Sequence, residues 1–206
     1  MLPLLPMWFV YIAAAMRIIG GFAYLRATLI GKAKPNPVSW LLWGIIPIIV
    51  FIAELQAGVG LVALVTLAVG ISPILVFFAA IHKNRRSFEL RGFNLLCALI
   101  AVSGIILWIN NKNPEIAIII MILADIASAL PTIKKILQKP NSEFPPSYLL
   151  SASSMVIALL AVSNWTFAAV AYPIYVLAIN LIIFYLTTRP RKQINKKRSP
   201  AKRHKK

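Results

Sequence analysis

Residues 25–43, with the sequence LRATLIGKAKPNPVSWLLW, resemble residues 130–151, with the sequence LPTIKKILQKPNSEFPPSYLLS. Both stretches start with a leucine, carry a Lys-Pro-Asn triplet and end in serine, an aromatic residue and two leucines. The offset between the copies is 105 residues from Leu25 to Leu130 and 108 residues from Ser39 to Ser147, because the second copy holds a three-residue insertion. Each copy joins two apolar stretches through a short basic loop. This pattern predicts a duplicated membrane unit.

The composition of the chain is that of a membrane protein. Hydrophobic residues make up 60% of the 206 residues and charged residues 13%, with a mean hydropathy of +0.81. A soluble domain would need more polar surface than this chain can supply. The formal net charge of +17 comes from Lys and Arg clustered between apolar stretches and near the C-terminus, which argues against a specific nucleic-acid partner.

Seven apolar segments are long enough to cross the roughly 30 Å of a bilayer core, which takes about 17 to 25 residues. We expect all of them to be helices, because an open sheet would leave backbone groups unpaired in lipid. The predicted fold class is therefore an all-α integral membrane protein with seven transmembrane helices. The predicted spans cover residues 7–30, 38–55, 59–81, 92–109, 115–137, 146–163 and 166–187.

The basic residues predict the orientation of these spans. Twenty of the 22 Lys and Arg residues fall on one side of the predicted bilayer, whereas Lys112 falls on the other side and Arg17 within the first span. The positive-inside rule then places the N-terminus outside and the C-terminus in the cytoplasm, as expected for a multi-pass protein of the cell membrane. We expect the first span to be a retained helix and not a cleaved signal peptide.

Two three-span units can share one orientation only if a further span separates them. The predicted architecture is therefore 3+1+3, with parallel repeats related by an axis along the membrane normal. Residues 1–83 form the first repeat, residues 84–112 the linker helix, residues 113–188 the second repeat and residues 189–206 a disordered basic tail.

This arrangement resembles the PQ-loop superfamily, which includes the SWEET-like (MtN3/saliva) transporters and the KDEL receptor. The Pro-Gln pair is degenerate here: the second copy reads Leu-Pro-Thr at residues 130–132, and the first reads Leu-Arg-Ala at residues 25–27. The resemblance implies alternating access, with Pro131 as a hinge. It also implies that Asn180 contacts substrate, and the 108-residue offset maps Asn180 to Ser72.

Polar residues inside the predicted spans mark a candidate site. Asp125 lies near the middle of the fifth span, where an ionised carboxylate costs at least about 2.5 to 3.5 kcal/mol, and Ser128 follows on the same helical face. Arg17 maps through the repeat offset to a position one turn from Asp125. Three interpretations remain open: an internal salt bridge, a substrate-binding charge, and proton coupling through a neutral Asp125.

Further candidate residues lie in the second and sixth spans. Ser147, Ser151 and Ser154 share one helical face, and they either pack against a neighbouring helix or bind a solute. Trp43 could stack on a substrate, whereas Trp40 is expected in the aromatic belt at the membrane interface.

The sequence gives no sign of chemistry that would need a cofactor. No triad, paired carboxylates or phosphate loop is visible, and His82 and His204 have no partners at metal-ligand spacing, so we expect neither an enzyme nor a metal site. The basic tail is expected to bind anionic lipid headgroups, with a ribosome or RNA contact left open.

These features together predict a transporter of a small polar solute, either a sugar or an amino-acid-like molecule, that works by rocking two three-helix bundles. A receptor or sensor of the PQ-loop type is the first alternative, and an insertase-like protein with a ribosome-binding or lipid-binding tail is the second. The sequence leaves open the solute, the direction and coupling of transport, and whether the chain forms homo-oligomers.

Overall fold

The computed structural model describes residues 3–84, 88–110 and 113–189, and regular secondary structure in these ranges is helical throughout. Two short 3-10 helices, η1 (Gly60–Val62) and η3 (Pro140–Ser142), accompany the α-helices. The α-helices, in chain order, are α1 (Phe9–Leu29), α2 (Pro37–Gln56), α3 (Ala63–Lys83), α4 (Gly92–Asn110), α5 (Pro114–Gln138), α6 (Pro145–Leu160) and α7 (Phe167–Thr188).

Length and composition identify this bundle as a multi-pass membrane protein. Five helices, α1, α2, α3, α5 and α7, are long and apolar enough to cross a bilayer, and α3 together with η1 forms one of these spans. The apolar stretches Gly92–Leu107 of α4 and Pro145–Leu160 of α6 are shorter. Helix α6 has 16 residues, which at 1.5 Å per residue is about 24 Å. It ends before the predicted boundary of residue 163, with Ala161 as its C-cap and a turn of non-helical residues leading to α7.

Asparagine and proline start two of the helices. The Asn36 side chain accepts hydrogen bonds from the backbone N–H groups of Val38 and Ser39, and Pro37 is the first residue of α2. Asn113 and Pro114 begin α5 in the same way. Asparagine satisfies N–H groups that a helix start leaves unpaired, and proline lacks the N–H that would be wasted there.

The second copy of the repeated loop is built differently. The proline and asparagine of its Lys-Pro-Asn triplet are part of η3, and the asparagine does not cap an α-helix. Helix α6 therefore begins only at Pro145. The three inserted residues, Ser142 to Phe144, therefore lie between η3 and α6. They place a glutamate, Glu143, where the first copy has no equivalent residue.

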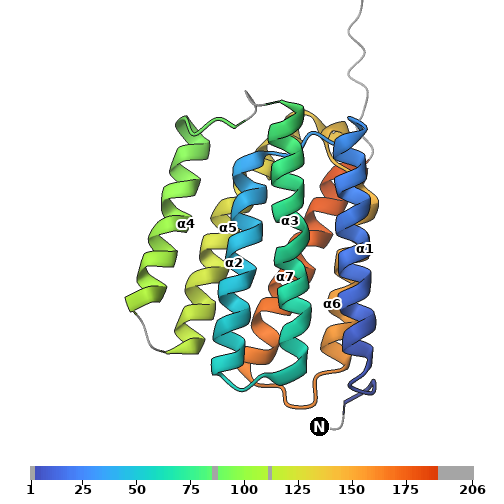
Figure 1. The fold of residues 1–206 in the computed structure, drawn as a ribbon, viewed down its shortest axis with the longest axis vertical. Coiled ribbons are helices and arrows are strands. Elements are labelled where there is room, and N and C mark those ends of the chain that lie inside the picture. The colour runs from blue at the N-terminus through green and yellow to red at the C-terminus, as the bar shows by residue number, and fades with distance from the viewer. Residues whose placement is uncertain (1–2, 85–87, 111–112, 190–206) are drawn as a thin grey trace, which may run out of the picture.

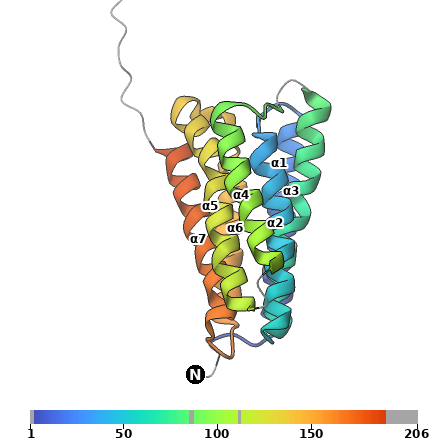
Figure 2. The ribbon, with the colours of Figure 1, turned by 90° about the vertical axis from the view of Figure 1, so that its left-hand side faces the viewer.

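The helices form two layers of three, with α4 at one edge (Figures 1 and 2). Helix α3 packs between α1 and α2 in one layer, and α7 packs between α5 and α6 in the other. Across the layers, α1 packs against α6 and α2 against α5. Helix α4 packs mainly on α5.

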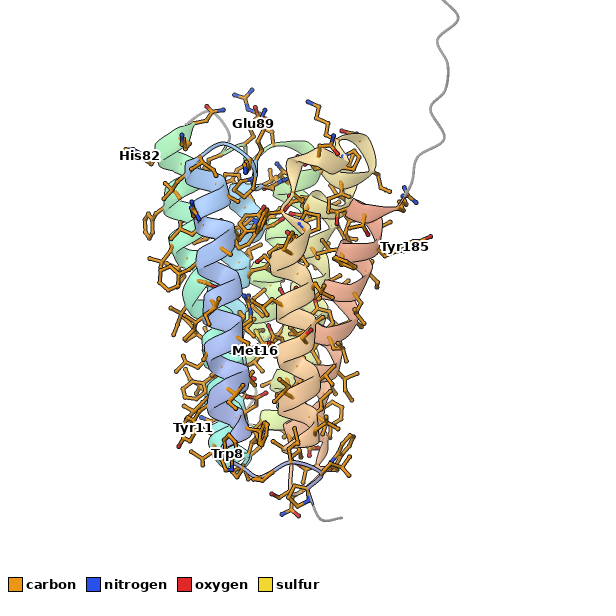
Figure 3. The ribbon with its side chains drawn as sticks, turned by 90° about the vertical axis from the view of Figure 1, so that its right-hand side faces the viewer. Trp8, Tyr11, Met16, His82, Glu89 and Tyr185 are labelled. Carbon is orange, nitrogen blue, oxygen red and sulfur yellow. The ribbon has the colours of Figure 1, made fainter. Side chains whose placement is uncertain are left out.

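Successive helices run in opposite directions, so the connections alternate between the two ends of the bundle (Figure 1). The α1–α2, α3–α4 and α5–α6 connections and the end of α7 share one end, called here the basic end because it carries Lys32, Lys34, Lys83, Arg91 and Lys139. Figure 3 shows His82 and Glu89 at this end, and Trp8 and Tyr11 at the opposite, N-terminal end. The basic residues Arg85, Arg86 and Lys112 and the tail from residue 190 lie outside the described residues.

Small residues allow close backbone approach within the first layer. A Cβ atom added to Gly70 of α3 would lie 2.9 Å from the Gly44 carbonyl oxygen of α2. On α1, a Cβ atom at Gly21 would overlap the Cβ and Oγ atoms of Ser72. Such contacts between small residues let helices pack closely in membranes.

Substituting Gly21 tests this packing, with its neighbour as the control. Gly21→Ala should destabilise the protein by about 1–3 kcal/mol, because α1 and α3 have to separate. Gly20→Ala should be neutral or stabilising, because its new Cβ would meet its nearest neighbours at an ordinary 3.4 Å and alanine favours helix. Thermal unfolding of the purified variants in detergent measures both effects. Equal melting temperatures for the two variants would contradict the close approach.

Candidate functional site

A cavity lies between the two layers, in the half of the bundle nearer the basic end. The volume that the centres of water molecules can occupy in it is about 50 Å³. This is room for a few water molecules. All six helices of the two layers line it, and α4 does not. The polar and aromatic lining residues are Arg17, Trp40, Trp43, Asp125, Ser147, Tyr148, Ser151 and Asn180.

Arg17 of α1 extends into this cavity and is held by α3. Its Nη2 atom donates to the Val69 carbonyl oxygen at 3.2 Å, and its Nη1 atom lies 3.5 Å from the Ser72 hydroxyl. The Val69 carbonyl is free to accept because Pro73, four residues later, has no N–H to donate to it. Proline in α3 therefore creates the acceptor that positions the guanidinium group.

Asp125 of α5 is bound by hydroxyl groups and not by Arg17. The Ser128 hydroxyl lies 2.7 Å from the Asp125 backbone carbonyl oxygen and 3.1 Å from Oδ1, and it shares its proton between them; the Oδ2 atom accepts from the Tyr172 hydroxyl at 3.2 Å. Among the described residues, Lys135 and Glu143 form an ion pair, with their N and O atoms within 4.0 Å. Arg17 and Asp125 do not come that close. The two charged groups share one cavity, but the direct salt bridge considered from the sequence is absent from it.

Three buried donor groups in the cavity lining have no hydrogen-bond partner among the described residues. They are the Nε atom of Arg17, the Nε1 atom of Trp40 and the Oγ atom of Ser151. Their side chains are 9%, 4% and 2% exposed. A buried donor without a partner costs about 1–3 kcal/mol. Water molecules in the cavity, or a ligand with acceptor atoms, would satisfy these donors.

Most of the site residues predicted from the sequence either line this cavity or lie directly behind the residues that line it. Trp43, Ser151 and Asn180 line it together with the two charged residues, and the Asn180 amide also donates to the Val176 carbonyl at 2.7 Å. Ser72 and Ser128 lie behind, where they contact Arg17 and Asp125. Pro131, the predicted hinge, is a buried residue inside the continuous helix α5.

Trp40 contradicts the expectation that it belongs to an interfacial belt. It is buried, its ring centroid lies 4.1 Å from that of Tyr24, and it lines the cavity. The two layers enclose it, because it belongs to a buried cluster with Val76 of α3 and with Ile136 and Ile183 of the other layer. The repeat offset pairs Trp40 with Tyr148, which lines the same cavity from α6.

Glu143 links helices of the two layers at the basic end, beside the cavity-lining residue Tyr148. The Tyr24 hydroxyl of α1 and the Tyr148 hydroxyl of α6 both donate to its Oε2 atom, the latter at 2.7 Å, and Lys135 of α5 forms an ion pair with it. Glu143 is only 4% exposed. A single carboxylate thus joins helices of both layers above the cavity.

The two copies of the repeated loop are joined beside this carboxylate. The Lys34 backbone N–H donates to the Ser142 carbonyl oxygen at 2.8 Å, and the Lys135 ammonium donates to the Lys34 carbonyl oxygen. At the opposite end the layers meet through apolar packing, which includes Val10, Ile118 and Ala158. Contacts between the layers therefore lie on both sides of the cavity, as polar links toward the basic end and as apolar packing toward the opposite end.

Sequence reasoning missed Glu143, Tyr24 and Tyr172. A signal existed for Glu143, because it is one of only five acidic residues and lies in the insertion that distinguishes the two copies. The tyrosines carried no such signal, since their partners are 119 and 47 residues away in the chain.

No protein-family model, curated protein or solved structure matches this chain. Within residues 3–84, 88–110 and 113–189, no group of three or more His, Cys, Asp or Glu residues could hold a metal ion. The cavity instead presents hydrogen-bond donors, one carboxylate and apolar walls, which are the elements of a site for a small organic solute.

Removing the tyrosine hydroxyl groups tests the link at Glu143. Tyr24→Phe and Tyr148→Phe should each destabilise the protein by about 1.5–3 kcal/mol, because each deletes a hydrogen bond to a carboxylate. Tyr185→Phe is the matched control, since Tyr185 is 64% exposed on the outside of α7 (Figure 3). Thermal unfolding in detergent checks these values, and wild-type stability of Tyr148→Phe would contradict this link.

A pair of double-mutant cycles tests the environment of Asp125. Asp125→Asn and Tyr172→Phe should be coupled by about 0.5–3 kcal/mol, because the two side chains are hydrogen-bonded. The coupling between Asp125→Asn and Arg17→Gln should be smaller, since these groups make no direct contact. Stability measurements on the single and double variants give both couplings, and a larger value for the Arg17 cycle would restore the salt-bridge interpretation.

Proposed function

We propose that this protein is a transporter that moves a small polar solute across a membrane by alternating access. The cavity carries the proposal: it lies between two three-helix layers, its lining residues include unpartnered donors, and the layers contact each other on both sides of it. A solute bound there could leave toward either end if the layers rocked against each other, as the repeats of many transporters do. No covalent chemistry and no cofactor are part of this proposal.

The moving units would be α1–α3 and α5–α7, with α4 as the linker of a 3+1+3 architecture. The helix contacts support this assignment, since exchanging α1, α2 and α3 for α5, α6 and α7 maps the α1–α6 contact onto the α5–α2 contact. The order within the layers is also the same, with the third helix of each unit in the middle. This is the pattern expected of two repeats about an axis along the bundle.

The basic end would face the cytoplasm of a cell membrane, following the positive-inside rule. Anionic lipid headgroups would then contact the lysines of the connecting loops and the basic tail. In this orientation the Glu143 links close the cytoplasmic exit, and release of solute into the cytoplasm requires them to open.

Flux measurements with the full chain in proteoliposomes test the proposal. Saturable uptake of a labelled solute, with glucose, alanine and propionate as the first three probes, is the expected result. Saturable binding without flux of any of these probes would favour a receptor and overturn the transporter.

Cross-linking the two repeated loops tests the mechanism separately. Lys34→Cys and Ser142→Cys in a Cys97→Ala background should form a disulfide, because the backbones of these residues are hydrogen-bonded. Oxidation should abolish flux, since the basic end could no longer open, and a reductant should restore it. The two single-cysteine variants under the same oxidant are the controls. Wild-type flux through the cross-linked protein would contradict gating at this end.

A further inference from the structure

We infer that the solute carries a carboxylate group, which Arg17, Trp40 and Ser151 bind together. This inference rests on the proposed transport site and names the chemical class that the site selects. The three side chains reach one cavity from α1, α2 and α6, so a ligand that contacts all of them connects both layers.

The unpartnered groups are suited to an acceptor. The indole N–H of Trp40 and the guanidinium N–H of Arg17 can only donate hydrogen bonds, and the Ser151 hydroxyl can donate one. A sugar hydroxyl could use such donors, but it would bring no negative charge to the Arg17 guanidinium, which has no ion-pair partner among the described residues. A carboxylate offers two oxygens and a full negative charge, and charge-assisted hydrogen bonds to guanidinium are among the strongest in proteins.

The surrounding charges leave Arg17 available for this role. Its protein partners at hydrogen-bond distance, Val69 and Ser72, are neutral acceptors. Asp125 accepts from Ser128 and Tyr172, and Glu143 is engaged by Lys135 and two tyrosines above the cavity. The nearest acidic groups of the site are therefore already bound by other side chains.

The rest of the cavity suits an apolar body on the same molecule. Besides the polar residues Asp125, Ser147, Tyr148 and Asn180, its walls are formed by the Trp43 ring and by proline and branched aliphatic side chains, namely Pro47, Val69, Pro73, Val176, Ile179 and Ile183. A small monocarboxylate with a short aliphatic or aromatic body presents a charged end to the three donors and an apolar end to these walls. The limited volume favours such a compact solute over a disaccharide or a peptide.

Binding to the full-length protein in detergent tests this inference, with propionate and benzoate as probes and their amides, propionamide and benzamide, as matched neutral controls. The acids should raise the melting temperature and bind saturably by calorimetry, and the amides should not. Arg17→Gln should abolish acid binding, whereas Arg17→Lys should retain part of it because it keeps the charge.

Two conservative variants separate binding from folding. Ser151→Ala removes only a hydroxyl donor that has no protein partner, so it should not lower the melting temperature of the free protein. Trp40→Phe removes an unpartnered N–H donor and also part of a ring that packs against Tyr24, so it should lower that temperature, and its acid binding is measured well below its own melting temperature. Each should raise the dissociation constant for propionate and benzoate about tenfold or more, since a hydrogen bond to a charged group is lost. Ser154→Ala is the matched control, because the Ser154 hydroxyl donates to the Ser151 carbonyl and does not line the cavity. It should leave acid binding unchanged.

Equal affinity for the acids and their amides, or wild-type acid binding by Trp40→Phe and Ser151→Ala, would overturn the inference. So would saturable glucose flux that the two acids fail to inhibit, although the proposed transport function would then stand. Acid binding with the expected variant pattern but no flux would instead support the carboxylate site and overturn transport.

Discussion

A single buried carboxylate joins the two halves of this bundle. Glu143 accepts from Tyr24 of one layer and Tyr148 of the other, and its charge is balanced by Lys135. A buried charge is stable only when it is paired and fully hydrogen-bonded, so these four side chains have to be placed together or not at all. The α1–α2 and α5–α6 connections, the aromatic cluster around Trp40 and the side of the cavity toward the basic end all depend on this placement.

The requirement that buried polar groups be hydrogen-bonded also explains why Pro73 and Arg17 lie next to each other below Glu143. Pro73 leaves the Val69 carbonyl without its usual helical donor, and an unpaired carbonyl is costly inside a membrane protein. Arg17 supplies the missing hydrogen bond from α1. The proline in α3 thereby provides an acceptor for the buried arginine in α1. The guanidinium is held at the cavity without an acidic partner.

The helical fold and its approximate spans could be predicted from the sequence, because membrane insertion leaves a strong hydrophobic signal over each helix. Much of the site could also be predicted, since Arg17, Asp125 and Asn180 are polar residues in apolar surroundings and the cavity is lined by all three. Trp40 was misplaced because an aromatic residue at a helix start looks the same whether lipid or a second layer covers it. Tyr24 and Tyr172 could not be found, since their roles depend on partners brought close only by packing between helices far apart in the chain.

Helix α6 is shorter than its neighbours, with 16 residues against 25 in α5. At about 24 Å it falls short of a typical hydrocarbon core of roughly 30 Å. The hydrophobic thickness of the protein therefore differs around its circumference. The bilayer next to α6 has to become thinner, or the bundle has to tilt. Each ångström of mismatch costs a fraction of a kcal/mol in free energy. Because α6 carries Ser151 and Tyr148, a bilayer that tilts or shifts this helix would move one wall of the cavity.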